Sequence, residues 1–251
     1  MKKIVTTLVT LGALASTLSA DIARLEVGGG MWQENPIGSM SYSDFATTGT
    51  YTSKEESRTN AYVWMLIKHP IPIIPNVRLE YVNVSDDGVV SGTFDGFPSP
   101  APANTPANFD IVAYDVIPYY NLLDNTFWIT IDVGLDIRIM ETDYSVSPNM
   151  GFIGYNDTTS IVLPLAYGRG RVEIPATNIG LEADVKYLTY DGSTVYDFRA
   201  KVDYTFDFIP IIQPAIELGY RVQKVDLTSD DEKTNMDMEF SGIYAGFMLR
   251  F

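Results

Sequence analysis

The sequence contains no cysteine and only one histidine, His69. Without cysteine, a domain of this size has no disulfide framework and must be held together by other means. The histidine precedes Pro70 in a predicted turn. A Ser/His/Asp catalytic triad would need this histidine, and the sequence offers no other. We therefore expect a structural role for His69 and no enzymatic activity, and the sequence predicts no cofactor and no metal site.

Long apolar runs and an excess of positive charge are also absent. Beyond residue 20, no segment holds roughly 18 consecutive apolar residues, as a membrane-spanning helix would require. The chain has 17 Lys and Arg against 32 Asp and Glu, a formal net charge of −15. Because phosphates need cationic side chains opposite them, this balance argues against nucleic acid as a partner.

The beginning of the chain has the layout of a secretory signal peptide. Lys2 and Lys3 form a basic start, residues 4–14 an apolar core and residues 15–20 a small-residue exit. We expect residues 1–20 to be cleaved off, with the cut within one or two residues of Ala20. Residues 21–251 then form one all-β domain, for which this length is ordinary.

The clearest structural signal lies at residues 127–140, where apolar and polar side chains alternate from Phe127 onward. A period of two is that of a β-strand, whose successive side chains point to opposite faces. One face is wholly apolar, and the other carries Asp132, Asp136 and Arg138. The strand is longer than the usual five or six residues and is long enough to cross a bilayer at a tilt.

Similar alternation predicts ten strands, at residues 22–33, 60–69, 77–85, 110–120, 127–140, 160–174, 179–190, 194–207, 215–226 and 237–251. Short or proline-rich connections (69–76, 121–126, 175–178, 209–214) alternate with longer polar ones (34–59, 86–109, 141–159, 227–236), apart from a tight Asp191-Gly192 hairpin. This is the plan of a closed antiparallel outer-membrane β-barrel with short periplasmic turns and long extracellular loops. Re-pairing of segments 77–85 and 160–174, the second interrupted by Pro164, would give eight strands instead.

Three features favour a membrane barrel over a soluble sandwich, which alternation alone also permits. The strands are long, their charged faces carry both signs, and aromatic residues lie near their ends. The aromatic residues, typical of interfacial girdles, are Tyr119, Tyr120, Phe127, Trp128, Tyr187, Tyr196, Phe206 and Phe208. Since Arg or Lys facing lipid at mid-bilayer costs roughly 2–4 kcal/mol, the charges must point inward.

The inward faces balance eleven basic residues against eleven acidic ones. The basic residues are Arg24, Lys68, Arg78, Arg138, Arg169, Arg171, Lys186, Arg199, Lys201, Arg221 and Arg250; the acidic ones are Glu26, Glu80, Asp115, Asp132, Asp136, Glu173, Glu182, Asp184, Asp197, Asp203 and Glu217. An unpaired buried charge is costly, so this balance predicts a lumen crossed by ion pairs. Paired long side chains nearly fill a narrow barrel, which argues against a wide pore and leaves room for a narrow or gated path. The Asp132/Asp136 pair fits this ion pairing better than carboxylate catalysis.

Two further motifs are explained more simply by a structural role than by a binding role. The acidic runs at residues 86–87 and 230–232 could hold a divalent cation, but they lack the spacing of a calcium loop, so solvated surface is the simpler interpretation. No helix follows the glycines at residues 28–30, so they do not predict a phosphate site; they would accommodate a luminal side chain or a close strand crossing. We expect the proline-rich segment 97–106 to be an extended, mobile loop.

The end of the chain, with Tyr244, Phe247, Leu249 and Phe251, resembles the C-terminal strand of small Gram-negative outer-membrane barrels. In those proteins the pattern is read by the barrel-insertion machinery, which the resemblance implies as a partner. Segments 27–32, 79–82, 187–192 and 219–227 are similar to a family of uncharacterised outer-membrane barrels marked by a Gly-Gly near the mature N-terminus.

These resemblances imply a location in the outer membrane of a Gram-negative bacterium, in contact with outer-membrane lipids and lipopolysaccharide. They bring no established activity. We expect a structural role or narrow-channel transport of small solutes. The alternative is a surface-binding protein, an adhesin or receptor acting through acidic loops, and an outer-membrane enzyme comes third.

Overall fold

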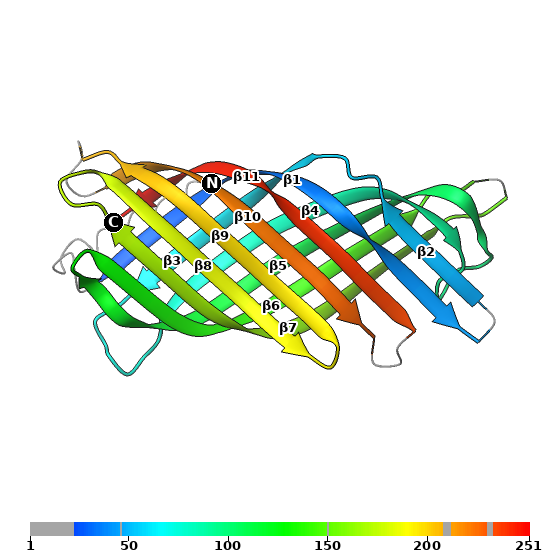
Figure 1. Cartoon of the computed structure of the whole chain (residues 1–251), viewed down its shortest axis with the longest axis horizontal. Coiled ribbons are helices and arrows are strands. Elements are labelled where there is room, and N and C mark those ends of the chain that lie inside the picture. Colours follow the sequence, from blue (N-terminus) through cyan, green and yellow to red (C-terminus); the bar gives the residue numbers. More distant parts are fainter. Residues whose placement is uncertain (1–22, 46, 150, 208–211, 230–232) are drawn as a thin grey trace, which may run out of the picture.

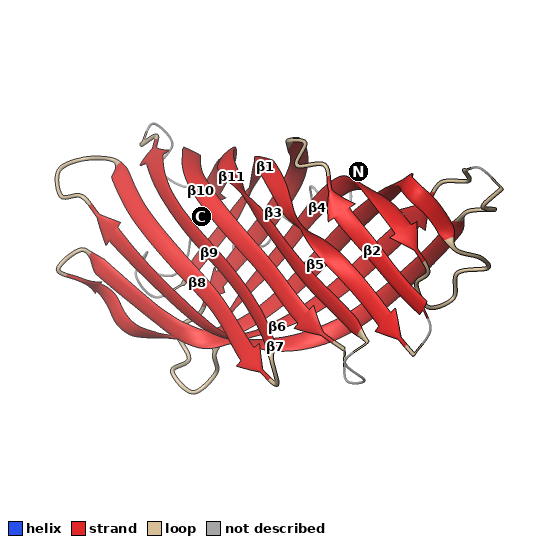
Figure 2. Ribbon diagram, turned by 45° about the vertical axis from the view of Figure 1, so that its right-hand side comes forward, coloured by secondary structure: helices blue, strands red, loops and turns tan. Residues whose placement is uncertain are grey.

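The computed structural model of this chain describes residues 23–45, 47–149, 151–207, 212–229 and 233–251. The predicted signal peptide, Phe208 and the acidic run 230–232 lie outside the described residues. The strands, drawn in Figures 1 and 2, are β1 Arg24–Asp44, β2 Thr47–Ser53, β3 Arg58–Lys68, β4 Asn76–Gly92, β5 Ala101–Thr126, β6 Ile129–Val146, β7 Tyr155–Glu173, β8 Ile179–Tyr190, β9 Ser193–Thr205, β10 Gln213–Thr228 and β11 Thr234–Arg250.

The strands form one closed antiparallel ring. The last strand, β11, pairs with β1 from Glu26↔Arg250 to Tyr42↔Thr234, and this pairing closes the barrel. β2 and β3 share one position in the ring, because both β1 and β4 pair with β3 along one stretch and with β2 along another. The eleven strands therefore occupy ten positions, which confirms the predicted ten-stranded closed barrel. The eight-stranded alternative is wrong.

The strands extend further than the sequence analysis predicted. Residues 34–44, 86–92, 141–146 and 155–159, predicted as loop, all lie in strands, and β5 begins at Ala101 inside the segment predicted to be mobile. The predicted turn at 121–126 is also wrong, because these residues belong to β5 and the turn is Phe127–Trp128, both at positive φ (53° and 66°). Asp191 and Gly192, at φ 46° and 79°, form the predicted tight hairpin.

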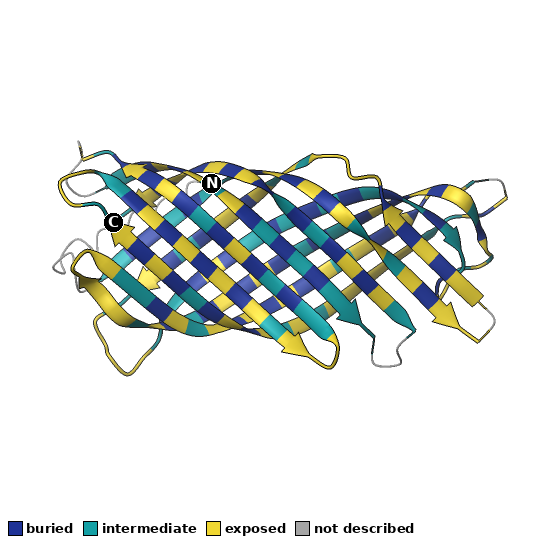
Figure 3. Cartoon of the chain, viewed as in Figure 1, coloured by how far each residue is buried: buried dark blue, intermediate teal, exposed yellow. Residues whose placement is uncertain are grey.

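The outward side chains divide the barrel into two halves. Towards the end where β1 begins and β11 ends they are apolar, and Figure 3 shows the alternation of exposed and buried positions; examples are Met31, Val63, Ile67, Leu79, Val116, Val133, Leu135, Ile137, Ile139, Val162, Leu181, Val185, Phe198, Val202, Ile216, Leu218, Ile243, Phe247 and Leu249. Further along the same strands they are polar, as at Gln33, Asn35, Asn83, Ser85, Glu141, Asp143, Ser160, Lys224 and Asp237. We call these stretches the membrane half and the outer half.

Aromatic side chains mark both edges of the apolar band. Tyr81, Tyr114, Tyr187 and Tyr220 lie at the edge next to the outer half, and Tyr120, Phe127, Trp128 and Tyr204 lie at the other edge. Tyr119 was wrongly assigned to this girdle, because its side chain points inward and is 1% exposed. A closed ring with an apolar band between aromatic girdles is the arrangement of a transmembrane β-barrel, and this protein is an outer-membrane barrel of that kind. Within the described ranges, no helix is long and apolar enough to span a bilayer.

The interior reverses the outward pattern. In the membrane half the inward side chains are largely charged, whereas in the outer half they are largely apolar. On β6, for example, Met140, Tyr144 and Val146 point inward while Glu141 and Asp143 point outward. This reversal explains why segment 160–174 shows apolar residues on both faces.

Candidate functional site

One group of ion pairs surrounds Arg138 in the membrane half. Its fully buried guanidinium donates two hydrogen bonds to Asp115 of β5, both of 2.8 Å, and a third of 2.7 Å to Asp197 of β9. Arg221 of β10 donates to the same Asp197 carboxylate, with an Nε–Oδ1 distance of 2.9 Å. Bidentate guanidinium–carboxylate pairs fix geometry as well as charge, so these contacts join both sides of the lumen.

A second group connects opposite walls. Glu80 on β4 accepts hydrogen bonds from Lys186 on β8 (Nζ–Oε2 2.5 Å) and from Arg199 on β9 (Nη2–Oε1 2.9 Å). In the ring of ten positions, β9 is five positions from β4 and therefore lies opposite it. Glu80 thus takes part in ion pairs that cross the lumen at its full width.

A third group lies nearer the end of the barrel where β1 begins and β11 ends. Arg169 donates to Asp132 (2.5 Å) and to Glu182 (2.7 Å), and Arg171 holds Asp203 through two hydrogen bonds of 2.5 and 2.9 Å. All five side chains are buried. The group joins β6, β7, β8 and β9, and the Arg138 contacts lie between it and the outer half.

A fourth group includes aromatic rings and lies beside β1 and β11, the strands that close the barrel. Glu217 accepts hydrogen bonds from the Tyr62 hydroxyl (2.7 Å), the Trp64 indole (3.2 Å) and Lys201 (2.8 Å). The Lys201 ammonium also lies 4.6 Å from the centre of the Trp64 ring, a cation–π contact. A Cβ at Gly28 would lie 2.5 Å from that ring, so the glycine makes room for a luminal side chain.

The structure buries eighteen of the twenty-two inward charges predicted from the sequence: Glu26, Arg78, Glu80, Asp115, Asp132, Asp136, Arg138, Arg169, Arg171, Glu182, Asp184, Lys186, Asp197, Arg199, Lys201, Asp203, Glu217 and Arg221. The other four, Arg24, Lys68, Glu173 and Arg250, are partly buried. Arg24 is only partly buried and lies 3.6 Å from Glu26, which receives a shorter bond of 2.7 Å from Arg250. Asp136 is buried, but within the described residues neither of its oxygens has a hydrogen-bond partner, and it lies 3.9 Å from Arg138.

The four residues of the predicted insertion signal do not share one face. Phe247 and Leu249 point outward and are 74% and 42% exposed, whereas Tyr244 points inward and is 2% exposed. The Phe251 N–H donates to the Leu25 carbonyl (2.8 Å), which fixes the end of the chain to the first strand. Recognition of these residues by the insertion machinery remains a prediction.

His69 is occupied within its own turn. Its Nε2 lies 3.0 Å from the Pro75 carbonyl oxygen, its Nδ1 accepts from the Ile71 N–H (3.2 Å), and its backbone N–H donates to Asn76 (3.0 Å). These contacts organise the connection between β3 and β4 and are those of a turn residue.

The adjacent acids Asp86 and Asp87 point to opposite faces of β4. Asp86 faces inward and accepts hydrogen bonds from the hydroxyls of Tyr51 (2.7 Å) and Ser53 (2.9 Å), and burial raises the pKa of its carboxyl. Asp87 lies on the outer surface and pairs with Arg58. The two carboxylates therefore do not form a shared cation site.

A buried acid, Glu34, lies in the outer half just beyond the apolar band. Its Oε1 accepts hydrogen bonds from Asn60 (2.6 Å) and from the Ser85 N–H (2.9 Å), while its Oε2 has no hydrogen-bond partner among the described residues. Burial outweighs these bonds and raises the pKa of Glu34 to about 7. This carboxyl therefore changes protonation near neutral pH.

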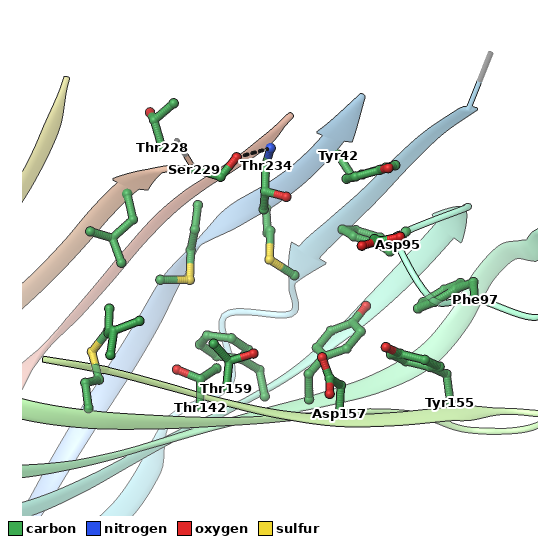
Figure 4. Close-up of a pocket in the computed structure, with 18 of the residues that line it drawn as sticks. Tyr42, Asp95, Phe97, Thr142, Tyr155, Asp157, Thr159, Thr228, Ser229 and Thr234 are labelled. Atoms are coloured by element: carbon green, nitrogen blue, oxygen red, sulfur yellow. Dashed lines mark hydrogen bonds between the residues drawn. The ribbon is translucent and has the colours of Figure 1, made fainter. Parts of the chain in front are cut away.

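The outer half contains a partly open cavity of about 560 Å³, which we call the outer chamber. Apolar side chains line much of it: Met40, Phe97, Phe109, Met140, Ile161 and Leu163. Figure 4 shows Thr228, Ser229 and Thr234, from the facing ends of β10 and β11, across the cavity from Thr142, Asp157 and Thr159 of β6 and β7. The chamber was not predicted from the sequence, because much of its lining lies in segments predicted as loops.

A signal for the chamber does exist in the sequence. At the ends of the predicted strands the apolar residues change to the other face, and this alternation continues into the predicted loops, as from Ala113 and Ile111 to Phe109 or from Phe240 and Met238 to Met236. These residues are all buried in the structure. A switch of the apolar residues from the outward to the inward face along one strand is therefore the sequence signal of the outer half.

No protein-family model matches the sequence, and no curated protein matches it. Solved structures with a similar strand arrangement include the outer membrane protease OmpT from Escherichia coli, at 11% identity over 94% of this chain and 99% of that chain (TM-score 0.45). Others are the outer membrane protein OprG from Pseudomonas aeruginosa (13%, 93% and 98%, 0.40) and the translocator domain of autotransporter NalP from Neisseria meningitidis (10%, 100% and 98%, 0.43). These likenesses carry no activity over to this chain, and membership of the Gly-Gly barrel family remains a prediction.

Proposed function

We propose that this protein is an outer-membrane barrel without an open pore, with a structural role or a role in slow passage of small solutes. The observation that carries this proposal is the set of hydrogen bonds from Lys186 and Arg199 to Glu80 on the opposite wall. Long side chains from facing strands meet there and occupy the middle of the lumen.

A continuous path through the lumen would require several of these pairs to separate. Breaking one buried pair costs about 3–5 kcal/mol, because each partner is left charged and without its counter-ion. Fully open states are therefore rare at equilibrium, and solute passage is narrow or gated.

Single-channel recording in planar lipid bilayers tests the proposal. We expect the purified wild-type barrel to show no large, stable conductance. Replacing Glu80, Lys186 and Arg199 together by Ser should create conductance by removing the crossing pairs. Glu141→Ser, which removes an outward charge of the outer half, serves as the matched control. A large, stable conductance of the wild-type protein would instead support a porin and overturn the proposal.

The alternative of surface binding is favoured by one feature, the extension of the barrel wall beyond the apolar band. Removing residues 97–106 would not test it cleanly, because residues 101–106 belong to β5. Point substitutions inside the outer half give a better test.

A further inference from the structure

The outer chamber differs from the rest of the lumen because it is open space with an apolar lining. Its volume of about 560 Å³ falls within the roughly 300–1,000 Å³ of sites that hold small molecules. Methionine and aromatic side chains such as Met40, Met140 and Phe109 line it, and flexible thioethers adapt readily to different apolar shapes. The lining therefore suits an aromatic or aliphatic molecule.

The charges of the chamber select against anions. Among the described residues that line it, none is basic, while Asp95 and Asp157 are acidic. Tyr144 is 9% exposed, and its hydroxyl has no hydrogen-bond partner among the described residues. Burial raises the pKa of Tyr144, so the hydroxyl keeps its proton and can donate to an acceptor on a ligand. A neutral ligand with an acceptor atom fits this lining.

The barrel wall is incomplete beside the chamber. β7 pairs with β6 along its length, but it pairs with β8 only from Ala166↔Tyr187 to Glu173↔Gly180. Beyond that point β7 continues to Tyr155, whereas β8 ends at Tyr190 and turns back into β9. In Figure 1 the β8–β9 hairpin ends short of the loop that joins β6 and β7. We call this unpaired stretch of β7, residues 155–165, the β7–β8 gap.

Pro164 lies in this gap, two residues beyond the last pair, Ala166↔Tyr187. Proline has no N–H to donate to a ladder and is found at strand edges, which is what β7 becomes here. Leu163, next to it, lines the chamber, and the exposed Val162 and Tyr187 belong to the apolar band and its aromatic girdle. The end of the gap next to Ala166 therefore adjoins the apolar band, at the level of the outer leaflet, and the rest of the gap lies in the outer half.

We propose that the outer chamber binds a neutral, largely apolar small molecule, which enters and leaves through the β7–β8 gap at the outer leaflet. This function is independent of conduction through the lumen. A barrel that passes no current can still take up such a molecule from the membrane.

Two related fluorescent probes test the chemistry of binding. N-phenyl-1-naphthylamine is neutral, and 8-anilinonaphthalene-1-sulfonate is its sulfonated analogue. We expect the full chain in lipid nanodiscs to bind the neutral probe saturably, at about one per barrel above protein-free discs, and at least about tenfold more tightly than the anionic one, a difference of about 1.4 kcal/mol. Equal affinity for the two probes would overturn the chamber as a neutral-ligand site.

Substitutions on two faces of one strand locate the site. Leu163→Trp fills the chamber and should weaken neutral-probe binding about tenfold, whereas Val162→Trp, on the lipid-facing side, should leave it unchanged. Leu227→Trp fills the same space from β10 and replaces Leu163→Trp if that variant does not fold. Equal binding by the filled and control variants would place the probe outside the chamber and overturn the proposal.

The route is tested by release kinetics. Pro164→Val restores an N–H at the gap and should slow probe release several-fold while changing affinity little. Pro118→Val alters another outward-facing proline, in β5, and should leave the rate unchanged. Retained binding with the same release rate in all three proteins would overturn entry through the gap.

Discussion

The membrane half and the outer half of this barrel are built by the same strands but have opposite chemistry. In the membrane half, lipid requires apolar side chains outside, so polar ones point inward and must be paired. In the outer half, water surrounds the barrel, and the interior becomes an apolar core around a cavity. The solvent outside thus determines what fills the inside.

The comparison also shows two ways of limiting the lumen. Charged side chains cross it in the membrane half, where Arg138 bonds both Asp115 and Asp197. In the outer half, rings such as Phe94, Phe97 and Tyr144 pack at centroid distances of 5.4–6.5 Å and surround the remaining space. In the membrane half every buried charge needs a counter-ion. In the outer half the apolar packing leaves a space that a ligand can occupy.

The largest effect should follow from breaking the charge network at Arg138, whose three hydrogen bonds reach carboxylates on two other strands. Arg138→Met leaves Asp115 without its bidentate partner and Asp197 with fewer donors, and we expect it to lower the free energy of unfolding by about 3–5 kcal/mol. Urea unfolding of the protein in lipid vesicles measures this change.

The neighbouring acid provides the control. Asp136 has no hydrogen-bond partner among the described residues, so Asp136→Asn removes a poorly compensated charge and should change stability by less than about 1 kcal/mol. If the two variants lost equal stability, the network would not depend on the bonds observed at Arg138.

A second, smaller effect is a pH dependence of stability that comes from Glu34 in the outer half. The pKa of Glu34 in the folded barrel is about 7, above its ordinary value of 4.5. Between these values the folded state binds more protons than the unfolded state, so stability falls as pH rises through this window. Glu34→Gln should remove about 1–3 kcal/mol of this pH dependence, measured by unfolding at pH 5, 6 and 7. Parallel stability curves for wild type and variant would contradict it, and Glu141→Gln, on the outer surface, controls for loss of charge.

The membrane half could be predicted from sequence because lipid enforces a simple rule. Residues 129–139 alternate without exception, and charges such as Asp132, Asp136 and Arg138 could only point inward. Their partners could not be predicted, since contacts like Glu80 to Arg199 join residues 119 positions apart across the ring. Balance of charge indicates pairing but does not say which charges pair.

The outer half escaped prediction for a different physical reason. Its outward residues are exposed to water, and a polar strand such as Glu141 to Val146 has the composition of a loop. The Phe127–Trp128 turn was missed because two-residue turns at positive φ normally use Asn and Gly. Both residues are exposed (82% and 54%) at the end of the barrel where β1 begins and β11 ends, and aromatic side chains anchor such an end at the membrane interface.

The smallest expected effect concerns an arginine–aspartate ion pair like that of Arg138 and Asp115, but one that is exposed to water. Arg58 pairs with Asp87 on the surface of the outer half, where both side chains are about one-third exposed (34% and 33%). Water screens this pair, so Arg58→Met should cost only about 0.2–1 kcal/mol, and less at 1 M salt, whereas the cost of Arg138→Met should persist in salt. Unfolding at low and high salt measures both differences. An equal salt response of the two variants would mean that water reaches the membrane-half network, and the contrast between the halves would fail.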